Sequence, residues 1–212
     1  MATASQSLFN MTVASDNAGG NQGLLMPKLQ FRFRVNFINF GVDASGGLNL
    51  TKQVVDVTRP QIQFNEITLP VYNSTLYLAG RYQWNPITVT VRDDASGTVS
   101  KAIGQQVQKQ LDFVEQSSAA TGQDYKFQTN IEILDGGNGA NAPTVLETWE
   151  LYGCFVQQAN YQNLAYSQNE AATIQLNIRY DNAIQAPLAS GIGASVGRTL
   201  GGTSVSGIGS GS

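Results

Sequence analysis

The chain has 212 residues, enough for one β-rich domain with extended ends, and it carries 12 Lys and Arg against 15 Asp and Glu for a formal net charge of -3. This balance argues against strong electrostatic binding to nucleic acid or to an anionic membrane. Histidine is absent, which removes the most common general base and transition-metal ligand, so we expect no enzyme activity, no metal site and no cofactor.

Neutral amides dominate the polar residues. The chain holds 20 Gln and 17 Asn, so amides outnumber all the charged side chains together. A free-standing monomer usually relies on charge for solubility. An amide-rich surface is better suited to burial in a large assembly or to facing a confined space.

The cysteine content and the N-terminus bear on the compartment. The single cysteine, Cys154, excludes an internal disulfide framework and is expected to be a small buried hydrophobe. Residues 1–23 lack the basic start and apolar run of a signal peptide, and the sequence has no apolar stretch long enough to span a bilayer. We expect a protein made in the cytosol, without a membrane anchor.

Composition divides the chain into three regions. Residues 1–27 form a polar N-terminal arm, residues 28–186 carry the patterned β domain, and residues 187–212 form a tail rich in Gly and Ser. The middle region is therefore expected to hold the fold.

Alternation of apolar and polar residues predicts the strands. In residues 29–37 every second residue is apolar, which is the period of a half-buried strand. The same period returns in 87–92 and 173–180, and further strands are expected at 51–57, 62–69, 125–133 and 145–156. In the last of these, Trp149, Leu151, Gly153 and Phe155 are expected on one face, with Trp149 buried.

Irregular positions and turns complete the pattern. The apolar face of 62–69 switches between Phe64 and Ile67, which predicts a bulge. Gly46-Gly47 predicts a flexible turn, and residues 135–139 predict a turn between two adjacent antiparallel strands.

One helix is predicted at 99–117, where apolar residues recur at spacings of three and four. Ser96 and Thr98 are expected to cap its start, and Thr121-Gly122 to follow its end.

Possible chemical sites have simpler structural explanations. Asp93 and Asp94 are too few for a cation loop and fit a turn before a helix. Glu147 and Glu150 fall on opposite faces of a strand, so a shared catalytic role is excluded. A basic strip of Arg32, Arg34, Lys52 and Arg59 could suggest a groove for single-stranded nucleic acid, but the nearby aromatic residues favour core packing.

We predict a mainly β fold, an antiparallel β-sandwich or barrel with one flanking α-helix. A closed monomeric barrel would leave all the polar strand faces in solvent, whereas a barrel shared by several subunits gives them an internal surface. We therefore expect strands that join neighbouring subunits into a continuous ring barrel.

Several stretches resemble the tube proteins of contractile phage tails. They are Phe31-Arg32-Phe33-Arg34-Val35, Leu69-Pro70-Val71-Tyr72, residues 78–84, residues 87–94, residues 149–156 and residues 173–183. The resemblance covers most of residues 28–186, and its specificity comes from the order of these strand patterns around one helix.

The resemblance implies a structural virion protein that forms stacked, hexameric rings of the inner tail tube, through which DNA is ejected into the host. It implies that this chain assembles with itself in the host cytoplasm, inside a sheath, together with baseplate and tape-measure proteins. Genomic DNA would pass through without specific binding, and the finished protein would reside in the tail of the virion.

Two sets of residues are candidates for assembly contacts. Residues 69–84 predict a protruding hairpin with exposed apolar residues, so Tyr72, Asn73, Tyr77 and Leu78 are candidate contacts to the next ring. The polar strand residues Gln175 and Asn177 are candidates for the channel wall or the seam between subunits.

Two other functions remain open from the sequence. The chain could form the inner tube of a phage-derived injection machine, a bacteriocin or a secretion tube, which passes no DNA. A secreted carbohydrate-binding sandwich is a second alternative, although only Trp84 and Trp149 supply tryptophan rings for sugar stacking.

Overall fold

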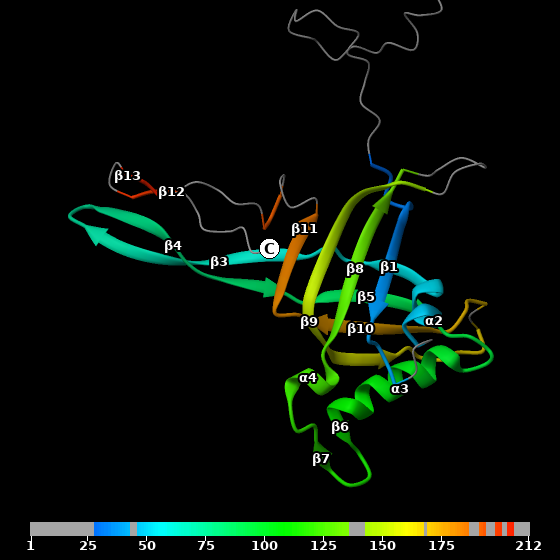
Figure 1. The fold of residues 1–212 in the computed structure, drawn as a ribbon. Coiled ribbons are helices and arrows are strands. Elements are labelled where there is room, and N and C mark those ends of the chain that lie inside the picture. The colour runs from blue at the N-terminus through cyan, green and yellow to red at the C-terminus, as the bar shows by residue number, and fades with distance from the viewer. Residues whose placement is uncertain are drawn as a thin grey trace, which may run out of the picture.

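The computed structural model describes residues 28–42, 46–135, 143–167, 169–186 and 191–193, and the backbone of 198–200 and 203–205. The fold is mainly β and antiparallel, as the sequence predicts, and Figure 1 shows two crossing layers of strands, helices at one end and a long hairpin at the side. The predicted arm, 1–27, and most of the predicted tail, 187–212, lie outside the described residues.

A seven-stranded antiparallel sheet forms the body of the described chain. Its strands, in spatial order, are β1 (Phe33–Ile38), β8 (Phe127–Leu134), β9 (Val145–Tyr161), β10 (Thr173–Arg179), β5 (Ile87–Arg92) and β2 (Val54–Val57), with β11 (Asn182–Ala186) also paired to β9. The predicted turn region 135–139 does join adjacent antiparallel strands, β8 and β9, although residues 136–142 lie outside the described residues.

The long strand β9 belongs to both layers. Up to Cys154 it pairs with β8, and its residues 148–152 also pair with β11; from Phe155 onward it pairs with β10. We call the layer of β1, β8, β11 and the first part of β9 sheet A. We call the layer of the second part of β9, β10, β5 and β2 sheet B.

Gly153 makes the passage of β9 between the sheets possible. Its φ is +67°, and a Cβ added there would lie 2.2 Å from Asp181 Oδ2, so only glycine fits without rearrangement. The irregularity moves the buried face from Trp149 and Leu151 to Cys154 and Val156. The predicted placement of Gly153 and Phe155 on the face of Trp149 is therefore wrong, whereas the predicted burial of Trp149 and Cys154 is confirmed.

The core lies between the two sheets. Alternate residues of β5 and β10 are fully buried in sheet B, which confirms the predicted alternation. Phe37, Phe40 and Phe127 form an aromatic cluster beneath sheet A, with ring centroids 5.0 to 6.4 Å apart. The predicted strand 29–37 begins only at Phe33, because residues 30 and 31 form a turn that exposes Phe31.

Helices close one end of the core. They are α2 (Gly46–Lys52), α3 (Thr98–Gln110) and α4 (Gly122–Tyr125), with a short hairpin of β6 (Leu111–Asp112) and β7 (Ser117–Ser118) after α3. The predicted flexible turn at Gly46-Gly47 is wrong: both glycines are buried in α2, and a Cβ on Gly47 would lie 2.3 Å from Phe37 O. The predicted strand 51–57 consequently begins only at Val54. None of the described helices is long and apolar enough to cross a membrane.

Helix α3 is shorter than predicted. It buries Val99, Ala102, Ile103 and Gln106, but it ends at Gln110 because Leu111 is extended, with φ -150°, and pairs with Ser118. Thr121 does not end this helix; it caps α4 instead.

The start of α3 is also capped differently from the prediction. Ser96 and Thr98 donate their hydroxyl protons to the Asp94 carboxylate, which itself accepts the Val99 N–H at 3.1 Å. The predicted helix-start role of the Asp93-Asp94 turn is thus confirmed: the N-cap residue is Gly97, and the Asp94 carboxylate, rather than a hydroxyl, accepts a first-turn N–H.

The second long feature is the hairpin of β3 (Gln61–Val71) and β4 (Ser74–Asn85), which forms a two-stranded sheet of its own and extends away from the body (Figure 1). The predicted protruding hairpin, 69–84, is confirmed and extends further, back to Gln61. A short pair, β12 (Arg198–Leu200) and β13 (Thr203–Val205), completes the described elements.

Candidate assembly surfaces

The β3–β4 hairpin carries a long series of exposed apolar residues in the described chain. Almost all its residues are exposed, and the exposed apolar ones are Ile62, Phe64, Ile67, Leu69, Val71, Leu76, Tyr77, Leu78 and Tyr82. Its base is fixed to the core by buried Trp84, whose ring lies 5.7 Å from that of Tyr180. A monomer rarely exposes so much contiguous apolar surface, which makes this hairpin a candidate contact surface.

A bulge divides the hairpin into two halves with opposite apolar faces. The register shifts between Phe64 and Glu66, so that Asn65 stands opposite Gly80 and Arg81. A Cβ on Gly80 would lie 2.8 Å from Asn65 O, which requires glycine there. The predicted bulge between Phe64 and Ile67 is confirmed.

The two halves present different residues. Near the body, the pair Phe64 and Tyr82 lies on one face of the ribbon, with rings 6.3 Å apart. Beyond the bulge, the apolar pairs Ile67–Leu78 and Leu69–Leu76 lie on the other face. We call this second set, with Val71, the distal apolar face.

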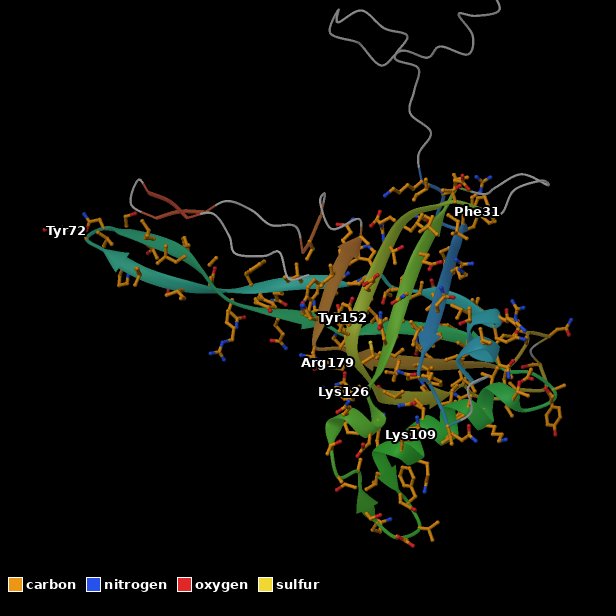
Figure 2. The ribbon with its side chains drawn as sticks, in the orientation of Figure 1. Phe31, Tyr72, Lys109, Lys126, Tyr152 and Arg179 are labelled. Atoms are coloured by element: carbon orange, nitrogen blue, oxygen red, sulfur yellow. The ribbon has the colours of Figure 1, made fainter. Side chains whose placement is uncertain are left out.

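The structure places the four candidate inter-ring residues on this hairpin. Tyr72 and Asn73 form its two-residue turn, and Figure 2 shows Tyr72 at the far tip. Tyr77 and Leu78 are consecutive, so they lie on opposite faces of the ribbon, and only Leu78 belongs to the distal apolar face. Ile67, Leu69 and Leu76 were not singled out from the sequence, although their two-residue spacing was a usable signal.

Tyr72 has a strained backbone. Its φ is +52°, in the left-handed region that favours Gly and Asn, and its side chain is fully exposed. A bulky aromatic residue in such a position at the end of a hairpin is a sign of function rather than of stability.

The outward face of sheet B carries the two candidate channel residues. Gln175 and Asn177 of β10 are half-buried on the face opposite the core. Asn177 accepts a hydrogen bond from Thr88 Oγ1 at 3.0 Å and donates one to Gln158 Oε1 at 3.1 Å. These bonds form a neutral polar ladder across β5, β10 and β9.

The outward face of sheet A is more highly charged. Arg34 of β1 forms an ion pair with Glu132 of β8 at 2.5 Å, and Asn36 donates to the same carboxylate at 3.0 Å. Gln128 and Asn130 lie beside them, joined by a 3.0 Å hydrogen bond. Of the two sheets, sheet B therefore offers the less charged central surface.

Sheet B has an unpaired strand at each end within the described residues. β2 pairs only with β5, and β9 beyond Cys154 pairs only with β10. At Val156 the free edge of β9 is covered by the side-chain amide of Gln110, which donates to Val156 O and accepts from Val156 N, both at 3.1 Å. Residues 157–161 of that edge remain available to another strand.

A hollow separates the unpaired edges of β1 and β2, and we call it the edge trough. It has a volume of about 830 Å³, with apolar walls that include Phe33, Val54, Val55 and Leu134 and with Lys52 and Arg92 among its charged residues. Val55 is the extra residue of a bulge in β2 and is 44% exposed. The basic residues considered for a nucleic-acid groove surround this region: Arg34 and Lys52 line the trough, and Arg32 and Arg59 line the smaller adjoining hollow.

The carboxylate of Glu147 is buried and joins Lys28 and Gln185 to sheet A. Glu147 accepts hydrogen bonds from Lys28, from Trp149 Nε1 at 2.7 Å and from Gln185 Nε2 at 2.8 Å. Burial alone would raise its pKa, but these bonds and the charge of Lys28 outweigh burial and hold the pKa below its ordinary value. Glu150 points to the other face and accepts a hydrogen bond from Tyr152, which confirms the predicted placement of the two acids on opposite faces.

Two other groups with shifted pKa values, Cys154 and Asp94, have structural roles. Burial raises the pKa of Cys154 to about 11, so the thiol stays protonated and is a poor nucleophile. Hydrogen bonds from Ser96, Thr98 and Val99 lower the pKa of Asp94 to about 2, which keeps the cap of α3 ionised. In the described part of the chain, acidic residues and Cys154 do not gather in a group able to hold a metal ion.

Solved structures resemble this fold, whereas the sequence comparisons identify no relative: no protein-family model and no curated sequence matches. The sheath/tube terminator of an extracellular contractile injection system, PVC, is 15% identical with a TM-score of 0.56, over 76% of this chain and 98% of that one. A chain of the PVC sheath-tube complex is 16% identical with a TM-score of 0.52, over 75% of this chain and 90% of that one. A chain of the anti-feeding prophage baseplate is 14% identical with a TM-score of 0.50, over 76% and 97%.

The chain therefore has the fold of tube and terminator proteins from contractile injection systems. At this level of identity the likeness concerns the fold, and function must be argued from the surfaces described above.

Proposed function

We propose that this chain is a structural protein, not an enzyme, and that it forms the inner tube of a contractile phage tail. The observation that carries the proposal is sheet B, a four-stranded layer with an unpaired strand at each end. A free subunit with two such edges invites pairing with other chains, and ring closure removes both edges.

The strand directions of sheet B suit a ring. Its strands alternate in direction, and their number is even, so β2 and β9 run in opposite directions. Rotation about an axis roughly parallel to the strands then brings β2 of one subunit beside β9 of the next in antiparallel pairing. β2 has four residues, which matches the short free stretch of β9 at 157–161.

We take six subunits per ring from the resemblance to phage tail tubes. The similar baseplate structure of the anti-feeding prophage is described as 6-fold symmetrised, which is consistent with this number. In such a ring, the main-chain hydrogen bonds of sheet B continue from subunit to subunit, and the inner sheets form one barrel.

We place the outward face of sheet B on the channel, with Gln175 and Asn177 in its wall. Each Lys or Arg that meets a phosphate adds affinity, and affinity retards moving DNA. The ladder of Thr88, Asn177 and Gln158 presents hydroxyl and amide groups instead, so genomic DNA would pass without specific binding.

The β3–β4 hairpin is the proposed contact between rings, through Tyr72, Asn73, Tyr77 and Leu78 and the distal apolar face. The charged face of sheet A and the helices would then face outward, toward a sheath protein. Baseplate and tape-measure proteins would be further partners, with assembly in the host cytoplasm and final location in the virion tail.

The inner tube of a phage-derived injection machine is a second candidate. It is favoured by the similar structures, since two of them come from an extracellular contractile injection system. The ring and stacking arguments hold equally for that machine, and the presence of packaged DNA in native particles distinguishes it from a phage tail.

Assembly is the experiment that tests the proposal. Sedimentation velocity at rising concentration, followed by negative-stain microscopy, should show rings and then hollow tubes. A variant with Tyr77→Asp and Leu78→Asp should still form rings but should not stack them, because the ring seam does not involve the hairpin. A compact monomer at every concentration would refute the proposed function.

A further inference from the structure

We infer that the tip of the β3–β4 hairpin docks in the edge trough of a second copy of this chain, with Tyr72 as its anchor. The inference rests on the proposed function and adds the receiving site, which the resemblance does not supply. It assigns Val55, Phe33 and Leu134 as contacts of the neighbouring copy's tip.

The hairpin and the edge trough lie at opposite ends of the same pair of strands, β2 and β5. The hairpin is continuous with β2 and β5: β2 leads into β3, and β4 leads into β5. The trough lies at the other end of these strands, at Thr51, Val54 and Arg92. Figure 2 shows Tyr72 at the far tip of the hairpin and Phe31, another trough residue, on the body.

The lengths of the elements allow the contact. β3 has 11 residues and spans roughly 35 Å, whereas the six residues of β5 span roughly 20 Å at about 3.3 Å per residue. A second copy displaced along the strand direction therefore lies within reach of the tip. Because tip and trough are different surfaces at opposite ends, the contact repeats from copy to copy without closing, as a stack requires.

The chemistry of the two surfaces also matches. The trough has apolar walls, and about 830 Å³ falls in the range of roughly 300–1,000 Å³ that proteins use to bury a small ligand, so it has room for the tip. The charged lining residues carry both signs, with Asp56 beside Arg34, Lys52 and Arg92, so the apolar walls are what favour docking of the tip.

The strained turn identifies the anchor. Tyr72 holds a left-handed backbone at the tip while its whole ring is exposed in the single subunit. Tyrosine is enriched among residues that dominate interface affinity, and such residues insert into pockets of the partner.

Cross-linking tests the receiving site. The chain has one cysteine, Cys154, which is buried, so introduced thiols react selectively. A variant with Asn73→Cys at the tip and Val55→Cys in the trough is treated with a short bis-maleimide reagent after assembly. The matched control pairs Asn73→Cys with Val114→Cys, an exposed residue of the turn between β6 and β7.

We expect a ladder of covalent oligomers from the tip–trough pair, at least tenfold more intense than from the control. Mixing the two single variants, Asn73→Cys and Val55→Cys, should give covalent dimers, which shows that the link joins different copies. If tubes form but neither the ladder nor the dimers exceed the control, the trough is not the receiving site, and the proposed function stands. If the unsubstituted chain forms no tubes, both proposals fail.

Discussion

At the scale of single residues, a proposed contact residue adopts a backbone conformation that its residue type disfavours. This residue is Tyr72. A left-handed backbone costs a non-glycine residue about 1–2 kcal/mol, yet this turn places a tyrosine there with nothing from its own subunit to compensate.

The substitution Tyr72→Gly should weaken the stacking of subunits while leaving the stability of the folded subunit almost unchanged. Relief of the backbone strain offsets the roughly 0.5–1 kcal/mol of chain entropy that glycine adds to the unfolded state, so subunit stability should change by less than about 1 kcal/mol. Loss of the aromatic anchor should weaken stacking by about 2 kcal/mol, or roughly thirtyfold in the concentration needed for tubes. Urea unfolding measures the stability of the subunit, and sedimentation measures the concentration needed for tubes. Tyr72→Phe is the control and should retain stacking. Normal assembly of the Tyr72→Gly variant would exclude the anchor role.

Glu147→Gln tests the buried carboxylate. In the folded chain its pKa lies below the ordinary 4.5, so its contribution to stability is complete above that pH and is lost as pH falls through the lowered pKa. At pH 7 the variant should lose about 1–3 kcal/mol, because Lys28 and the buried amide and indole donors lose a charged acceptor. The free energies of unfolding of the variant and the parent should approach each other as the pH falls below 4.5. A loss of stability in the variant that is the same at every pH would contradict this role.

At the scale of elements, regular alternation was predictable, whereas only some of its interruptions were. The strands 87–92 and 173–180 follow directly from a two-residue period, because each has one buried and one solvated face. The bulge near Phe64 was also predictable, since the apolar residues switch from even-numbered to odd-numbered positions within a single strand. By contrast, Gly153 carries β9 from sheet A to sheet B, and a Cβ there would clash with Asp181, which is distant in sequence.

The end of helix α3 could not be predicted from the spacing of its apolar residues. Apolar spacing continues to Val114, but the chain turns at Leu111 because Asp112 accepts the main-chain N–H groups of Val114 and Glu115 and stabilises a turn. Likewise, Gly46 and Gly47 look like a flexible turn in the sequence. In the structure, Gly47 allows α2 to pack closely on Phe37, and Gly46 approaches Phe40, which are tertiary constraints.

Lysine substitutions on the outward face of sheet B can be compared with matched substitutions on sheet A. Gln175→Lys with Asn177→Lys should add two cations per subunit to the channel wall, retain DNA and slow ejection by about tenfold or more at low salt, with relief as salt rises. Gln128→Lys with Asn130→Lys makes the same change on β8 of sheet A. That pair should leave ejection unchanged, and equal ejection by both variants in a DNA-ejection assay would place the channel elsewhere.

At the scale of the whole molecule, the proposed assembly completes a subunit that leaves strand edges and apolar side chains without partners in the described chain. In that proposal the unpaired edges of sheet B pair within a ring, and the exposed hairpin contacts a neighbour along the stack. The sequence pointed to the hairpin and to amide-rich strand faces. It could not show the edge trough or the cover of Val156 by Gln110, because both arise from segments far apart in the chain.

The most direct test of the central claim is a cryo-electron microscopy reconstruction of the assembled particle. We predict that β2 of each subunit lies in antiparallel register beside residues 157–161 of its neighbour, so that the inner sheets form one barrel around a channel. A particle in which β2 and this part of β9 remain unpaired, or are covered by their own chain, would contradict the account.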